Sequence, residues 1–280
     1  MYRYHQPIAQ RAMATTRSIV HTLRSLPSFR PGIAYVLDTT LHLAPTVLSP
    51  IATNYLRSCR VPHVGQAEST GISSAPTLHL CPSQSSTVDT DLGFEPLRDG
   101  AEDPTANELA SLVDQFYAAR TPIESLGSMG ENDCGVVFQG EGDPMAAADV
   151  VVDTVRSVAE LRNGIAFRLN TFGLCDAADV DLLLNSSVLA HGDSDQRRET
   201  RIATVGVFLP AANPLQYAEI IQPDHGLGFG DACSFVARLA EAGVSVECMT
   251  VARPDVNVGE VKALALSLGA TRFLTQGNSV

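Results

Sequence analysis

The amino-acid sequence predicts an α/β protein built on a parallel β-sheet. Apolar, strand-like runs alternate with helix-like segments through the second half of the chain, and turns rich in Gly, Pro and Asn separate them. The strand-like runs are apolar at consecutive positions, which is typical of strands buried on both faces. This alternation predicts a sheet that is either doubly wound or rolled into a barrel, with ligands at the carboxyl ends of its strands.

Composition sets limits on size and on partners. The chain has 280 residues, and a hydrophobic fraction of 45% is enough to bury the core of one large α/β domain or two small ones. A formal net charge of −12 opposes direct binding to nucleic acid or to anionic membranes, because phosphate attraction needs a basic face. No apolar run is long enough to cross a bilayer.

Residues 1–32 contain several arginines and no acidic residue, since Asp38 is the first acid of the chain. This composition predicts either a mitochondrial or plastid targeting segment or a disordered basic tail. The cysteines are too sparse for a disulfide scaffold, so we expect a reduced, intracellular protein, cytoplasmic if the tail carries no address. Residues 66–102 are rich in Ser, Thr, Pro and Gly, which predicts a disordered insertion.

Ordered elements are expected from Asp103 and Pro104 onward, which we interpret as the N-cap and first turn of a helix. The central feature is a strand at residues 136–138 that runs into a glycine-rich acidic turn, where Asp143 and Pro144 begin another helix. Further strands are predicted at residues 165–169, 202–209, 244–251 and 271–275. Further helices are predicted around residues 148–158, 180–184, 229–239 and 257–268, the last from the capping-box pair Asn257 and Glu260.

The turn after the central strand resembles the glycine–acid–proline turn of radical S-adenosylmethionine (radical SAM) proteins. Residues 168–174 and 212–223 are similar to a group of that superfamily linked to TatD-type nucleases, and the resemblance covers residues 136–273. It implies a partial (β/α)6 TIM-like barrel over residues 33–280, with the amino group of SAM held at the turn and a TatD-type nuclease as partner. The SAM-binding residues that it implies are Gly140, Glu141, Gly142, Asp143, Asn170 and Thr171.

The chemistry of this family depends on a Cys-x3-Cys-x2-Cys loop after the first strand, whose thiolates bind a [4Fe–4S] cluster. This chain lacks that loop. Cys59, His63 and Gln66 stand at the family spacing, but only Cys59 is a thiol, and a glutamine amide is a poor ligand for an iron–sulfur centre. We therefore expect no standard cluster, and Cys59 is the one candidate metal ligand.

Three hypotheses explain the missing loop. The chain is a degenerate, non-catalytic or regulatory barrel that binds SAM or a similar small molecule. Alternatively, it is a genuine radical SAM enzyme whose cluster loop is non-standard or was lost near Cys59 to a faulty gene model. The third hypothesis is that distant cysteines such as Cys59, Cys81 and Cys134 converge on a metal. We favour the first, because buried cysteines more often serve as small hydrophobic residues than as ligands.

Overall fold

The computed structural model describes residues 20–37, 40–50, 101–119, 135–140, 142–191, 199–223 and 226–276. They form one sheet of seven strands in sequence order. The first strand, β1 (Ala34–Leu37), pairs antiparallel with β2 (Thr40–Leu43), and every later neighbour is parallel. The later strands are β3 (Val136–Phe138), β4 (Ala166–Thr171), β5 (Arg201–Phe208), β6 (Val246–Val251) and β7 (Arg272–Gln276).

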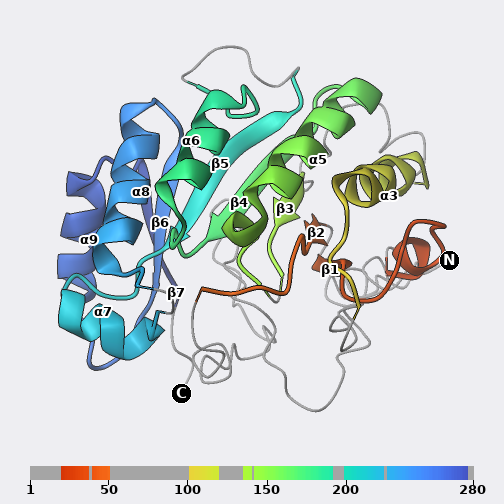
Figure 1. Cartoon of the computed structure of the whole chain (residues 1–280). Helices are drawn as coiled ribbons and strands as arrows, with labels where there is room; N and C mark the ends of the chain where they lie inside the picture. Colours follow the sequence, from red (N-terminus) through yellow and green to blue (C-terminus); the bar gives the residue numbers. More distant parts are fainter. Residues whose placement is uncertain are drawn as a thin grey trace, which may run out of the picture.

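Each pair of neighbouring parallel strands is joined through at least one helix, so β2 to β6 each begin a β/α unit and β7 is the last described strand of the series. The connecting helices are α3 (Ala106–Ala119), α5 (Ala148–Leu161), α6 (Ala177–Asn185), α7 (Pro214–Ile221), α8 (Phe229–Glu241) and α9 (Val258–Ser267). A short 3-10 helix, η1 (Pro144–Ala147), precedes α5. The helices line one side of the sheet (Figure 1), and β1 and β7 form its two edges. This arrangement confirms the predicted α/β fold and is that of a partial TIM-like barrel.

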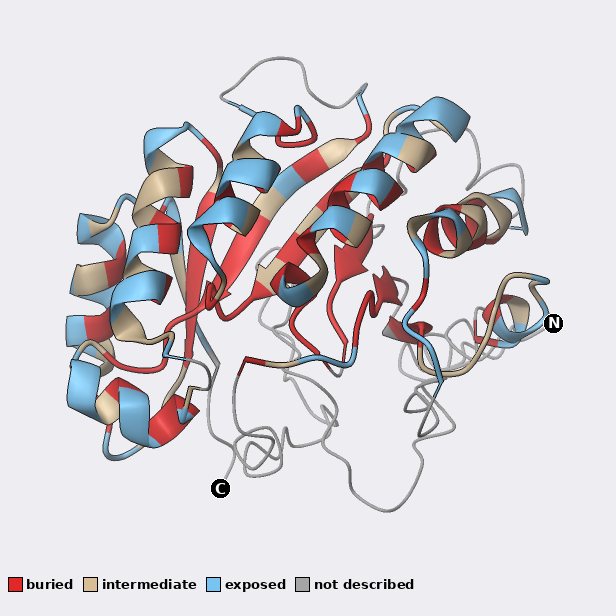
Figure 2. Cartoon of the chain, viewed as in Figure 1, coloured by how far each residue is buried: buried red, intermediate tan, exposed pale blue. Residues whose placement is uncertain are grey.

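The main core lies between the sheet and its helices. The helix surfaces that face the sheet are buried, and the opposite surfaces are exposed (Figure 2). Phe138 of β3 and Phe167 of β4 stack there with ring centroids 5.2 Å apart. Because Phe167, Leu169 and Thr171 face the helices, the alternate residues of β4 must face the concave side of the sheet.

The start of α3 differs from the prediction. Thr105 and Glu108 form the capping box, since the Thr105 backbone N–H donates to Glu108 Oε2 at 2.8 Å and the Glu108 N–H donates to Thr105 Oγ1 at 3.3 Å. Asp103 has another role: its carboxylate accepts from Thr46 Oγ1 at 2.5 Å and from the Val47 N–H at 3.2 Å. The predicted N-cap residue therefore holds the segment that follows β2.

Three elements lie outside the sequence prediction. Strands β1 and β2 have only four residues each, too few to show a period. Helix α7 has eight residues and is defined by its ends: Asn213 Oδ1 accepts from Leu215 N at 2.9 Å, and Gln222 ends the helix with φ of 50°. Short elements such as these are recognised by their caps and partners rather than by periodicity.

Some predictions fall outside the described residues. Cys59, Glu141 and residues 66–100 of the predicted insertion are among them, as are residues 1–19 of the basic segment. Residues 20–24 form a helical turn that places Val20 and Leu23 in the hydrophobic core. Among the described helices, none has both the length and the hydrophobicity that a membrane span requires.

Candidate functional site

Three loops meet at the carboxyl ends of β2, β3 and β4. The turn after β3 packs directly on the segment that follows β2: a Cβ added to Gly140 would lie 2.2 Å from the Cβ of Ala44, and one added to Gly142 would lie 2.4 Å from the carbonyl oxygen of Leu48. The Asp143 N–H donates to that same Leu48 oxygen at 2.8 Å. Both glycines are therefore needed for close contact between two loops of the rim.

Asp143 joins this pair of loops to the end of β4. Its carboxylate accepts from the Met145 N–H at 2.9 Å, which caps η1, from Thr171 Oγ1 at 2.7 Å, and from the Phe172 N–H at 2.8 Å. The side chain is buried. Desolvation raises the pKa of the Asp143 carboxyl above its usual range, and the hydrogen bonds from Phe172, Met145 and Thr171 oppose that shift.

The structure thus brings together the predicted site residues Gly140, Gly142, Asp143 and Thr171. Asp143 and Thr171 bond to each other on the helix side of the sheet, where both are buried. Asn170 faces the opposite, concave side, because successive residues of a strand point to opposite faces. Of these residues, Asn170 is the one whose side chain lies on the face that a barrel ligand would contact.

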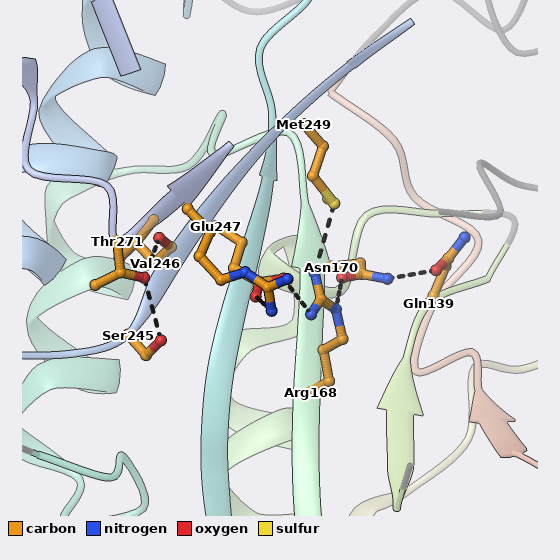
Figure 3. A network of polar contacts seen from close by, with 9 residues as sticks. Gln139, Arg168, Asn170, Ser245, Val246, Glu247, Met249 and Thr271 are labelled. Carbon is orange, nitrogen blue, oxygen red and sulfur yellow. Dashed lines mark hydrogen bonds and ion pairs between the residues drawn. The ribbon is translucent and has the colours of Figure 1, made fainter. Parts of the chain in front are cut away.

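A chain of polar side chains crosses the concave face from β3 to β7 (Figure 3). Asn170 Nδ2 donates to Gln139 Oε1 at 2.6 Å, and Arg168 Nε donates to Asn170 Oδ1 at 2.7 Å. Arg168 Nη1 pairs with Glu247 Oε2 at 2.7 Å, and Arg272 Nη1 pairs with Glu247 Oε1 at 3.1 Å. The side chains of Arg168 and Glu247 are only 12% and 6% exposed, so this ion pair is largely shielded from water.

Gly206 of β5 makes the crossing possible. The strand register places it between Asn170 of β4 and Glu247 of β6. A Cβ at this position would lie 2.5 Å from Asn170 Oδ1 and 2.7 Å from Arg168 Nη2. The side chain of Arg168 can reach β6 because β5 has no side chain in its path.

An apolar row lies next to the polar chain, towards the carboxyl ends of the strands. The register aligns Phe208 of β5 with Met249 of β6 and Leu274 of β7. Phe172, just after β4, contacts Phe208 edge to face with ring centroids 5.6 Å apart. The concave face therefore has buried apolar side chains near the rim, with hydrogen-bonding and charged groups below them.

Sequence reasoning missed Gln139, Arg168, Gly206, Glu247 and Arg272. A usable signal was present for two of them, because Arg168 and Glu247 each interrupt an otherwise apolar strand. A charged residue in a buried strand needs a partner, and each of these two supplies the partner of the other. Their separation of 79 positions hid the pairing.

The described residues do not fit an iron–sulfur cluster. No three His, Cys, Asp or Glu side chains among them gather as a metal site. Burial raises the pKa of the Cys175 and Cys248 thiols to about 12 and that of Cys233 to about 11, so these groups stay protonated near neutral pH. A cluster needs thiolates. Cys59, the predicted ligand, lies outside the described residues.

No protein-family model matches the chain. A segment is 32% identical over 125 residues to "Probable dual-specificity RNA methyltransferase RlmN 1" of Opitutus terrae, covering 42% of this chain and 32% of the relative. Among solved structures, Streptococcus suis SuiB bound to its precursor peptide SuiA superposes with a TM-score of 0.50 and 11% identity, covering 99% of this chain and 46% of SuiB. SuiB bound to S-adenosylmethionine gives a TM-score of 0.45 and 13% identity, covering 65% of this chain and 36% of SuiB.

These similarities cover less than half of each relative. The chain spans about a third of the curated methyltransferase that it matches and slightly less than half of SuiB. At 11% identity, the structural match concerns the fold alone, and it agrees with the partial barrel described above.

Proposed function

We propose that this protein is a radical SAM-like barrel that binds S-adenosylmethionine, or a similar small molecule, on the concave face near its rim, as a non-catalytic or regulatory protein. The observation that carries the proposal is the junction of three rim loops through Gly140, Gly142 and Asp143, beside a polar concave face. The sequence similarity to the RlmN methyltransferase and the fold similarity to SuiB support the radical SAM superfamily.

The side chains on the concave face suit the methionyl end of SAM, which carries one positive and one negative group. Gln139 and Asn170 carry amide groups next to the turn, and below them Arg168 and Glu247 form an ion pair that holds Asn170 in place. When bound, SAM would supply a sulfonium and an adenosyl group. The residues of this chain would orient it, while Asp143 and Thr171 hold the shape of the rim from the helix side.

The alternative is a genuine radical SAM enzyme that cleaves SAM reductively and acts on an unknown substrate. One observation favours it: β2 is the first parallel strand, and residues 44–48 after it pack on the glycine turn. This is the place that the resemblance assigns to the cluster loop. Cys59 comes later in the sequence and lies outside the described residues. The acidic net charge of −12 gives no support for an RNA substrate, and a TatD-type nuclease partner stays a prediction.

Anaerobic reconstitution of the full chain with iron and sulfide, followed by SAM titration calorimetry, separates the two candidates. The proposal predicts SAM binding by an iron-free protein, with the same affinity in the Cys59→Ser variant. About four irons per chain with matching sulfide, lost in Cys59→Ser, would establish the enzyme alternative. An iron-free protein with no SAM binding would overturn the proposed function.

A further inference from the structure

We infer that Gln139 is the end of a one-way hydrogen-bond relay that presents N–H donors to a carboxylate group of the ligand. Arg168 is the positioning residue that sets the direction of this relay. The inference rests on the proposed ligand site on the concave face and names the chemical group that the site selects.

The direction begins at Arg168, because a guanidinium can only donate hydrogen bonds. Arg168 is held in place by Glu247 on the far side of Gly206. Its Nε donates to Asn170 at 2.7 Å, so Asn170 must turn its oxygen, Oδ1, towards the guanidinium. This interaction leaves the Asn170 amide nitrogen directed towards β3.

The same logic applies one step further along. Asn170 Nδ2 donates to Gln139 at 2.6 Å, so Gln139 must present its oxygen, Oε1. Figure 3 shows the Gln139 amide nitrogen pointing away from Asn170. Gln139 is only 8% exposed, and no partner for its Nε2 is found among the described residues. A nearly buried amide with two unused N–H groups favours an acceptor on an incoming ligand.

The position of Gln139 points to a carboxylate. Gln139 directly precedes Gly140 and the turn to which the resemblance assigns the amino group of SAM. In an amino acid the carboxylate is one carbon away from that amino group. A carboxylate is an acceptor only, and hydrogen bonds to charged groups are stronger than those between neutral groups. The two N–H groups of Gln139 therefore match the carboxylate of the methionyl end.

Two substitutions that keep the size of the original side chain would each turn an oxygen, in place of the N–H donors, towards the ligand. In Gln139→Glu, one oxygen still accepts from Asn170, but the other would face and repel the ligand carboxylate. In Asn170→Asp, the new oxygen would accept from Gln139 Nε2, so Gln139 would turn its own oxygen towards the ligand. Asn163→Asp is the matched control, because it adds the same charge at an exposed position just before β4, at the opposite end of the strands. Thermal unfolding of all three variants checks that they fold, and the two relay variants test the inference independently.

Calorimetric titrations with SAM, decarboxylated SAM and L-methionine provide the test. We expect the wild type to bind SAM at least about tenfold more tightly than decarboxylated SAM, as for a hydrogen bond to a charged group. This preference should disappear in Gln139→Glu and Asn170→Asp and persist in Asn163→Asp.

The remaining outcomes separate the two proposals. If SAM does not bind but L-methionine binds in a manner that depends on Gln139, the proposed function fails and the relay stands. If the relay variants keep the wild-type preference, or if the wild type binds neither SAM nor L-methionine, the relay inference is overturned.

Discussion

Asp143 connects the loops that follow β2, β3 and β4 through its backbone N–H and one carboxylate. The resemblance implied a side chain directed at SAM, and that role stays a prediction. In the structure the carboxylate accepts from Met145, Thr171 and Phe172. These bonds make Asp143 a support for the shape of the rim, which gives it a measurable effect on stability.

We expect Asp143→Asn to lower the free energy of unfolding by about 1 to 3 kcal/mol, because a new amide N–H₂ group would face the donors that the carboxylate accepts from. Urea denaturation measures this change. Asp153→Asn is the control: Asp153 pairs with Arg156 on the surface of α5, where both side chains are at least half exposed, and the expected change is below about 0.5 kcal/mol. Equal losses in both variants would contradict the assigned role.

The pH dependence of the same variant has a defined sign. Burial raises the pKa of Asp143 in the folded state above its ordinary value of 3.8, so protonation favours folding. This contribution is complete below the unfolded pKa and is lost as the pH rises through the folded pKa. The stability advantage of the wild type over Asp143→Asn should therefore be larger at about pH 4 than at about pH 8.

At the scale of elements, the concave face ties β4, β6 and β7 together without involving the helices. Arg168 bridges from β4 to Glu247 of β6, which also accepts from Arg272 of β7. Buried ion pairs often add little net stability, because desolvation offsets the attraction. Their value here is geometric, since the Arg168 bridge also orients Asn170.

Gly206→Ala should disrupt this tie and cost about 1 to 3 kcal/mol of unfolding free energy, because the new Cβ would meet Asn170, Arg168 and Met249 within 2.8 Å. The matched control is Gly230→Ala in α8, where an added Cβ meets no atom within 4 Å. There the substitution should be neutral or stabilise the protein by up to about 1 kcal/mol. Chemical denaturation of both variants measures the contrast. An unchanged free energy of unfolding in Gly206→Ala would mean that Arg168 can reach Glu247 even with a side chain at position 206.

At the scale of the whole molecule, the packed region reaches back before residue 33. Leu23 is fully buried and Val20 is nearly so, although both lie within the segment predicted as a basic tail. The assignment of residues 1–32 as a targeting or disordered segment remains a prediction, as does the compartment. Within residues 20–32, the side chains of Val20 and Leu23 are part of the hydrophobic core.

Leu23→Ala should therefore lower the free energy of unfolding by about 2 to 5 kcal/mol, as for other large-to-small changes in a core. Leu215→Ala in α7 is the control, since that side chain is 77% exposed and its loss should cost less than about 0.5 kcal/mol. Thermal or urea unfolding of the full chain provides the comparison. A negligible effect at Leu23 would show that this segment is not needed for the fold.

The sequence by itself determined the alternation of strands and helices, the rim turn at Gly140 to Asp143 and the cap at Asn257. These features are local, because periodicity, glycine turns and caps act over a few residues. Only the tertiary structure decided that Asp143 faces the helices while Asn170 faces the concave side, and that Arg168 meets Glu247 across Gly206. Those contacts depend on the register between parallel strands, which the packing of the connecting helices sets and no local pattern encodes.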